Sequence, residues 1–171
     1  ILEFLSDYKS VSKNNQVEMG QAAAVIGTIH RQLEGKIPPF VKQYSKSFFL
    51  HWMNTFKEIL EEAEVEESWL FNLCNYFNEY VDLLVEGPLT LVHGEYYIKN
   101  ILVKKEHVCP IDWESAACSV GEIDLAALID NYPDAEYCIE RYAEARWPNP
   151  HLFLKAFNQR LLLARMYFYF R

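Results

Sequence analysis

Apolar residues recur at spacings of three and four over several long stretches, which is the period of a helix with one buried face. The first such stretch covers residues 16–33, and Gly35 follows as a C-cap. Further helices are predicted at roughly residues 45–63, 68–85, 122–131, 134–146 and 150–170. The last of these is apolar nearly all round, which predicts that it is buried. The inward positions of the second and third helices are expected to be Phe49, Trp52, Met53, Phe56, Ile59, Leu60, Leu70, Leu73, Phe77, Val81 and Leu84.

The pattern changes to short runs of strand length at residues 89–92, 100–104 and 108–112, with a tight turn at 105–107. Residues 1–5 are a further short apolar run, and the polar stretch 6–15 after them reads as a loop. With 171 residues, 51% of them hydrophobic, the chain is long enough for one packed domain. We therefore expect a single α+β domain, mostly α-helical, with a small β-hairpin.

The composition narrows the possible partners. A net charge of -8 without a Lys/Arg run disfavours a nucleic-acid partner. The opening residues carry neither a basic region nor a long apolar stretch, so no signal peptide or membrane span is expected there. The four cysteines show no metal-ligand spacing and indicate core residues of a cytoplasmic protein: Cys74, Cys109, Cys118 and Cys138. The first and last residues read as interior to a longer parent chain.

The segment LVHGEYYIKNILV carries the first candidate chemistry. His93, Gly94 and Glu95 follow an apolar strand, and Asn100 comes five positions after the acid. Phosphoryl transfer to a hydroxyl needs a carboxylate that accepts or orients the hydroxyl proton, and oxygen ligands that hold Mg²⁺. The spacing matches that of the HRDxxxxN catalytic loop of protein kinases, with Glu in place of Asp.

A second carboxylate follows in CPIDWE, where Asp112 ends the second strand of the predicted hairpin. A hairpin brings the start of one strand beside the end of the other, so Asn100 and Asp112 are expected to face one ion. Two hard oxygen ligands suit Mg²⁺, which keeps several waters and binds the phosphates of the nucleotide as well.

The blocks HGExxxxNIL, IDWE and GEIDLA occur in this order and resemble the signature of the aminoglycoside phosphotransferase and choline kinase superfamily. The resemblance implies the C-terminal lobe of a protein-kinase-like fold. It also implies that Glu95 is the catalytic base, that Asn100 and Asp112 bind magnesium, and that His93 and Asp124 support the loop structurally.

The resemblance extends over nearly the whole chain. Residues 1–5 resemble the family's interlobe hinge, so the backbone of Glu3, Phe4 and Leu5 would meet the adenine of ATP. The chain would then consist of this hinge, a helical part at 16–85, the catalytic loop and metal-binding hairpin at 89–114, and a second helical part at 122–170. The helices between Lys42 and Val85 would shape the pocket of a small-molecule hydroxyl acceptor.

Two features depart from the family pattern. Glu95 is one methylene longer than the usual Asp, which moves the carboxylate by roughly 1.5 Å, and misplacement on that scale can cost a large rate factor. The six glycines cannot form a GxGxxG loop. The nucleotide-binding N-terminal lobe is thus expected outside this chain, as its partner within the same parent, and the fragment alone is expected to be inactive.

The function indicated is ATP-dependent transfer of the γ-phosphate to a hydroxyl of an aminoglycoside-, choline- or sugar-amine-like molecule. Three alternatives stay open: a weakened pseudokinase that binds nucleotide or acts as an interaction module, a metal-dependent hydrolase, and a helical interaction domain. The acidic residues between 61 and 67 suit a cationic substrate, but the sequence favours a solvated helix end.

Overall fold

A computed structural model describes residues 7–149, 151 and 154–171. It forms helices where the spacing of apolar residues predicted them. The α-helices are α1 (Gln16–Leu33), α2 (Lys46–Glu62), α3 (Ser68–Tyr80), α4 (Asp82–Val85), α5 (Glu122–Leu128), α6 (Ala135–Arg146) and α7 (Leu154–Phe170). The strands are β1 (Lys9–Ser10), β2 (Leu89–Val92), β3 (Ile101–Lys104), β4 (His107–Pro110) and β5 (Ala117–Val120). Two short 3₁₀ helices are η1 (Ile98–Asn100) and η2 (Trp113–Ser115).

Side-chain caps mark the starts of the first two helices. The Asn15 side chain accepts a hydrogen bond from the Glu18 N–H at 3.2 Å, and the Ser45 hydroxyl accepts one from the Phe48 N–H at 3.3 Å. These contacts satisfy backbone donors that have no partner within the helix. Both helices therefore begin where the apolar period predicted.

The third predicted helix is interrupted at Val81, where the sequence analysis expected one continuous helix over residues 68–85. The Leu84 N–H bonds to the Val81 carbonyl three residues back, at 2.9 Å, so the chain tightens there and starts α4 in a new direction. A second prediction was wrong at Ile59, which is 56% exposed because it lies on the outer edge of the apolar face of α2.

The strands form two small antiparallel sheets. The predicted hairpin consists of β3 and β4, with Ile101 opposite Pro110 and a turn at Lys105 and Glu106. Strand β1 pairs with the outer edge of β3, and β2 pairs separately with β5. The sequence analysis missed β1, which has two residues inside a polar stretch, and it also missed β5.

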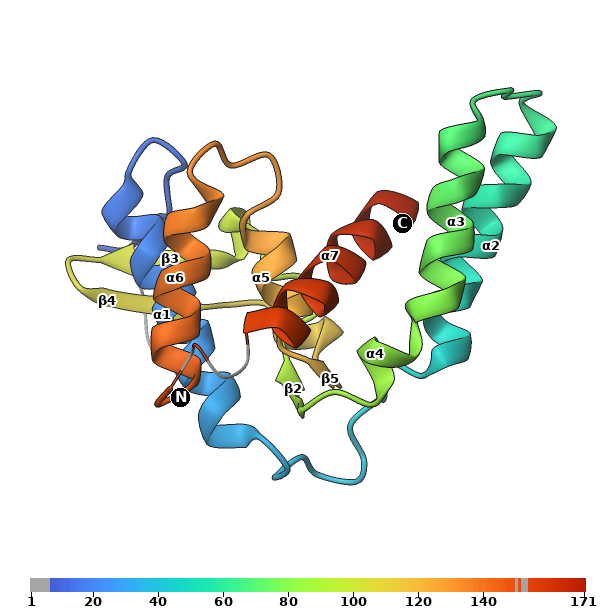
Figure 1. Cartoon of the computed structure of the whole chain (residues 1–171). Helices are drawn as coiled ribbons and strands as arrows, with labels where there is room; N and C mark the ends of the chain where they lie inside the picture. Colours follow the sequence, from blue (N-terminus) through green and yellow to red (C-terminus); the bar gives the residue numbers. More distant parts are fainter. Residues whose placement is uncertain (1–6, 150, 152–153) are drawn as a thin grey trace.

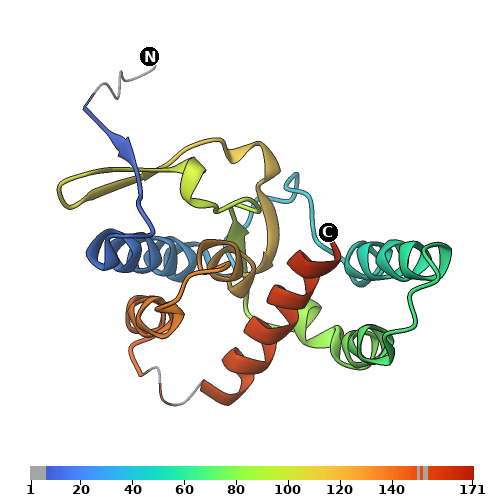
Figure 2. The same ribbon diagram turned by 90° about the horizontal axis from the view of Figure 1, so that it is seen from above.

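Helix α1 lies between the three-stranded sheet and α6, as Figure 2 shows from above. Its approach to α6 is close, since a Cβ atom at Gly27 would lie 2.8 Å from the Tyr142 carbonyl oxygen. On the opposite side of the molecule α2 and α3 form a helical hairpin, and α5 and α7 run between the two halves (Figure 1).

Helix α5 is buried along its whole length although it carries two acids. Glu122 is paired with the Arg160 guanidinium of α7 at 2.7 Å, and Asp124 is hydrogen-bonded in the site described below. Buried carboxylates of this kind need such partners to offset their desolvation. Helix α7 is less enclosed than its composition predicted, because Leu162 and Tyr169 are about half exposed. Among the described residues, no helix combines the length and apolarity that a membrane span requires.

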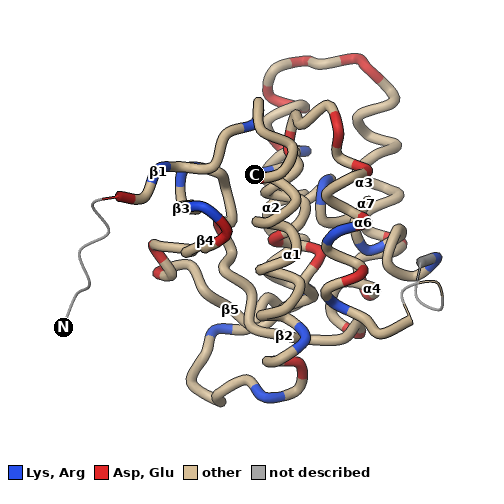
Figure 3. The backbone as a smooth tube through the Cα atoms, turned by 90° about the vertical axis from the view of Figure 1, so that its left-hand side faces the viewer, with Lys and Arg blue, Asp and Glu red and all other residues tan. Residues whose placement is uncertain are grey.

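The acidic run lies at the tip of the α2–α3 hairpin, at the end remote from α4 and β2 (Figures 1 and 3). Its carboxylates are all exposed: Glu61, Glu62, Glu64, Glu66 and Glu67. The run therefore forms a solvated connection between two helices, as the sequence favoured.

Candidate active site

The residues of the HGE motif form the loop between β2 and η1, and a buried carboxylate holds it. Asp124 accepts hydrogen bonds from the backbone N–H of His93 at 2.6 Å and of Gly94 at 2.8 Å. Both oxygens of Asp124 are used, and its side chain is fully buried. Asp124 thus lies beside His93, where the sequence analysis expected a structural acceptor.

Asp124 is itself held by a chain of two further side chains. His30 Nε2 lies 3.0 Å from Asp124 Oδ2, and His30 Nδ1 lies 2.9 Å from the Tyr142 hydroxyl. Burial, followed by the charge of Glu122, raises the pKa of Tyr142 well above its usual value, so the hydroxyl keeps its proton. Because a carboxylate can only accept, His30 Nε2 is the donor in its hydrogen bond with Asp124. Sequence analysis found neither His30 nor Tyr142 as a support of this loop, because neither stands near the motifs.

Gly94 gives the loop its sharp turn. Its φ of 82° lies in the left-handed region, and a Cβ atom there would meet the Ser115 carbonyl oxygen and the Tyr44 hydroxyl. Tyr44 donates to that same Ser115 carbonyl at 3.3 Å. The backbone at this position therefore packs against the segment that follows Asp112.

The backbone of Glu95 is fixed on both sides. Its N–H donates to His93 Nδ1 at 3.3 Å, and its carbonyl accepts from the Tyr97 N–H at 2.7 Å and from Asn100 Nδ2 at 2.9 Å. The carboxylate extends from the loop, and its Oε1 atom accepts from Arg171 Nη2 at 2.7 Å. Arg171 is the functional neighbour that sequence reasoning missed, because the two residues are separated by 76 positions.

Asn100 ends η1 and Asp112 follows β4 by two residues, so both lie just outside the strands that were predicted to carry them. The hairpin still brings their backbones close. The Asn100 carbonyl accepts from the N–H of Ile111, the residue before Asp112, at 2.9 Å. The Ile111 carbonyl in turn accepts from His93 Nε2 at 2.8 Å. Because Asn100 Nδ2 bonds to Glu95, its Oδ1 atom is the part of the amide left for a ligand. Asp112 is exposed and takes a left-handed conformation, with φ 65° and ψ 60°.

These oxygens can be tested for their fit to a metal ion. Within the described ranges no group of three or more His, Cys, Asp or Glu side chains is arranged to hold one. An amide oxygen and one carboxylate remain, which is a donor set for a hard cation that keeps waters or binds a phosphate as well. The predicted adenine contacts Glu3, Phe4 and Leu5 lie outside the described residues.

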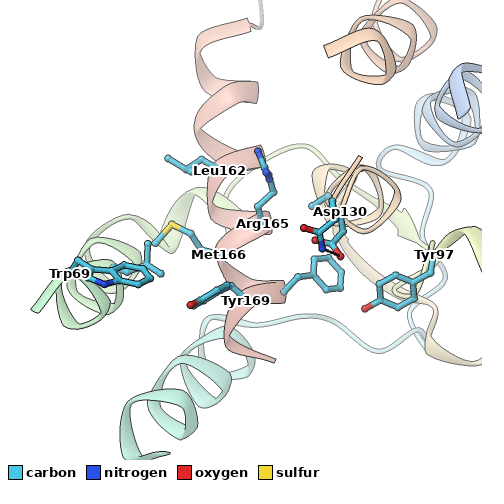
Figure 4. A pocket seen from close by; sticks show the side chains of 11 residues that line it. Trp69, Tyr97, Asp130, Leu162, Arg165, Met166 and Tyr169 are labelled. Carbon is cyan, nitrogen blue, oxygen red and sulfur yellow. Dashed lines mark hydrogen bonds between the residues drawn. The ribbon is translucent and has the colours of Figure 1, made fainter. Parts of the chain in front are cut away.

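A pocket of about 680 Å³ opens beside the HGE loop, between α3, α7 and the end of α5. Trp69 and Tyr97 lie at opposite ends of it, with side chains of α7 between them (Figure 4). Asp130 and Arg165 add one charge of each sign. The remaining lining residues are Leu73, Ala126, Asn131, Leu162, Met166, Phe168 and Tyr169.

A second pocket of about 270 Å³ lies near the other side of the last turn of α7. Arg171 lines it together with aromatic side chains of α2 and its preceding loop, and Lys42 is placed 4.9 Å above the Phe48 ring. The guanidinium of Arg171 lies 5.7 Å from the Trp52 ring centroid. The two pockets flank the HGE loop. Tyr97 lines the larger pocket, and Arg171, the partner of Glu95, lines the smaller one.

Helices around a short hairpin, with polar residues at the strand ends, form the C-terminal lobe of a protein-kinase-like fold. No family model matches the sequence, and no match is found among curated proteins. Solved structures do match. Choline kinase LicA from Streptococcus pneumoniae superposes with a TM-score of 0.66 at 14% identity, over 98% of this chain and 59% of that one.

A structure of LicA in complex with AMP gives a TM-score of 0.64 at 13% identity, over 98% of this chain and 57% of that one. The macrolide 2'-phosphotransferase MphH from Brachybacterium faecium gives 0.55 at 20% identity, over 92% and 55% of the two chains. The fold is therefore the one shared with these choline kinase and macrolide phosphotransferase structures, as the sequence resemblance implied. The chain spans somewhat more than half the length of these structural relatives.

Proposed function

We propose that this chain is the substrate-binding lobe of an ATP-dependent phosphotransferase that transfers the γ-phosphate to a hydroxyl of a small molecule. The observation that carries the proposal is the loop itself. Asp124 accepts from the two backbone N–H groups that precede Glu95, and Asn100 Nδ2 donates to the Glu95 carbonyl, so the backbone of this acid is fixed within the loop. Positioning of this kind supplies most of the catalysis in phosphoryl transfer.

Glu95 acts as the base in this proposal. The carboxylate is partly exposed, and its backbone is fixed by hydrogen bonds on both sides. One oxygen is bonded to Arg171, and the other has no hydrogen-bond partner among the described residues. That second oxygen, Oε2, would accept the proton of the acceptor hydroxyl. The hydroxyl oxygen would then bond to the γ-phosphorus as ADP leaves.

Asn100 Oδ1 and the Asp112 carboxylate would hold Mg²⁺. A bound Mg²⁺ neutralises charge on the phosphates, and it tolerates few protein ligands because the nucleotide supplies others. The residues fit this role because the amide of Asn100 is oriented by its bond to Glu95 and Asp112 follows directly on the hairpin contact. Structural support for both comes from His93, which bridges the Glu95 N–H and the Ile111 carbonyl.

The acceptor would occupy the larger pocket, whose volume suits a small-molecule ligand. Its aromatic walls and Asp130 favour an acceptor that carries an amine, since a cation is attracted both to ring faces and to a carboxylate. Trp69 and Leu73 belong to the helical insert that the sequence analysis assigned to this pocket. The choline kinases among the structural relatives are in keeping with an amine-bearing alcohol.

ATP would bind between this lobe and an N-terminal lobe of the same parent chain. The relatives' greater length and the AMP complex of one of them support this arrangement. The hinge contacts of Glu3, Phe4 and Leu5 with adenine belong to the same proposal. Because the sequence has no glycine-rich phosphate loop of its own, turnover is expected only when both lobes are present.

The test is Mg²⁺-dependent ADP formation by the two-lobed protein across a panel of hydroxyl-bearing amines and sugars. Acceptor-stimulated ADP should appear with at least one compound, and Glu95→Ala and Asp112→Ala should each reduce it by at least about 100-fold. Arg141→Ala is the control, since Arg141 makes only an exposed ion pair with Glu144 on α6.

Other outcomes select among the alternatives. MgATP binding without acceptor-stimulated ADP from any compound would favour a pseudokinase. Phosphate release that ignores the acceptor would favour a hydrolase. If the two-lobed protein fails to bind MgATP, the proposal is wrong.

A further inference from the structure

The one carboxylate of the HGE loop is not free in the structure. Glu95 Oε1 and Arg171 Nη2 lie 2.7 Å apart, and the two side chains are only 24% and 29% exposed. A charge-assisted bond of this length is short, and partial burial protects it from screening. The pair therefore differs from the exposed ion pairs on the helices of this molecule.

Arg171 is held in place from two directions. Its N–H donates to the Tyr167 carbonyl at 3.1 Å, which continues the hydrogen-bond ladder of α7. Its guanidinium lies 5.7 Å from the centroid of the Trp52 ring on α2, within reach of a cation–π attraction. Figure 2 shows that the end of α7 comes close to α2. The Arg171 charge is thus fixed relative to the loop by two different helices.

We infer that Arg171 is a positioning residue that makes the long side chain of Glu95 usable as the base, an inference that rests on the proposed function. A glutamate in this loop has one more rotatable bond than the aspartate of the family pattern, and its carboxylate would otherwise sample several positions. Binding Oε1 to Arg171 removes that freedom and leaves Oε2 for the acceptor hydroxyl. The additional methylene of Glu95 lets its carboxylate reach Arg171, and Arg171 fixes the position of that carboxylate.

The inference makes a specific prediction about Glu95→Asp. Shortening the side chain draws the carboxylate back by roughly 1.5 Å, so the contact with Arg171 would open from 2.7 Å to about 4 Å. Arg171 would then have no carboxylate to position. Substituting Arg171 should therefore matter in the wild-type background and cease to matter in the Glu95→Asp background.

The experiment measures acceptor-dependent kcat and the KM for MgATP in the two-lobed protein, for Arg171→Ala, Arg171→Lys, Glu95→Asp and the double variant. Arg171→Ala should lower kcat by roughly 10- to 100-fold, as expected for a misplaced catalytic group, with the KM for MgATP unchanged. Added guanidinium ion should restore part of that kcat, and lysine should preserve part of it. In the Glu95→Asp background, Arg171→Ala should change kcat less than about 3-fold.

Arg141→Ala serves as the matched control. Its kcat should equal that of the wild type and should not change when guanidinium is added. Rescue by guanidinium separates positioning from a folding defect, because a misfolded variant would not regain activity. Loss of the same size in both backgrounds, absence of rescue, or a rise in kcat on removing Arg171 would overturn the inference while wild-type turnover still supports the proposed function. A wild-type protein without acceptor-dependent turnover would overturn both.

Discussion

Asp124 is the buried carboxylate that holds the HGE loop, and Asp124→Asn tests this role with almost no change in shape. Three donors converge on it: the backbone N–H groups of His93 and Gly94 at 2.6 and 2.8 Å, and His30 Nε2 at 3.0 Å. Asparagine offers one acceptor oxygen in place of two and adds an NH₂ group. In either amide orientation at least one N–H would face another donor.

The size of the effect follows from these contacts. A hydrogen bond to a charged group contributes about 1.5–3 kcal/mol, and an unpaired buried N–H costs about 1–3 kcal/mol. Since the two terms overlap for a single donor, we expect Asp124→Asn to lower the free energy of unfolding by about 2–4 kcal/mol. For a domain of this size that corresponds to a fall in Tm of roughly 5–15 °C.

The measurement is equilibrium urea denaturation followed by far-UV circular dichroism, with a thermal scan in parallel. Asp82→Asn is the matched control, because Asp82 accepts from the Lys46 ammonium at 2.8 Å but is 49% exposed. That change should cost less than about 1 kcal/mol. Equal destabilisation by the two substitutions would refute the reasoning that Asp124 holds the loop through its buried charge.

Two further predictions concern local features. Gly94→Ala and Gly35→Ala both place a side chain at positive φ, but only at Gly94 would the new Cβ atom meet other atoms. Gly94→Ala should therefore lower the free energy of unfolding, measured by urea denaturation, by at least about 2 kcal/mol more than Gly35→Ala does. Equal losses would contradict the clash with Ser115. Burial is the main cause, and the charge of Asp134 a smaller one, that raises the pKa of Cys138 to about 12. Its thiolate is therefore scarce at pH 8, and mass spectrometry should find alkylation at the less buried Cys109 first. Prompt alkylation of Cys138 would contradict this.

Local patterns carried most of what the sequence could predict. Helix α1 begins and ends at the predicted residues, because an asparagine cap precedes a strong apolar period. The backbone contacts among Glu95, Asn100 and the residue before Asp112 follow from short-range features, namely a five-residue spacing and a hairpin. Their proposed roles stay predictions until the kinetic variants are measured.

Partners far apart in the chain could not be predicted in the same way. His30 reaches the loop through Asp124, which is 94 positions away, and Tyr142 reaches it through His30, which is 112 positions away. A lone histidine in a helical pattern does not reveal such a partner, because the sequence cannot distinguish a histidine that is only packed in the core from one that is also hydrogen-bonded there. The break at Val81 was missed for a related reason, as the apolar period continues across it while the backbone does not.

The position of Arg171 changes how the substitution in the HGE motif is interpreted. Taken alone, a longer acid in a catalytic loop indicates either a weakened enzyme or an adapted one. A carboxylate that is paired at 2.7 Å with a cation held by α2 and α7 has a defined position, which favours adaptation. If Glu95 were a relic without function, nothing would require its partner to be an arginine, and replacing that arginine by methionine would leave the protein as stable and as active as before. The kinetic cycle between residues 95 and 171 decides between these two interpretations, because only an adapted pair gives effects that depend on each other.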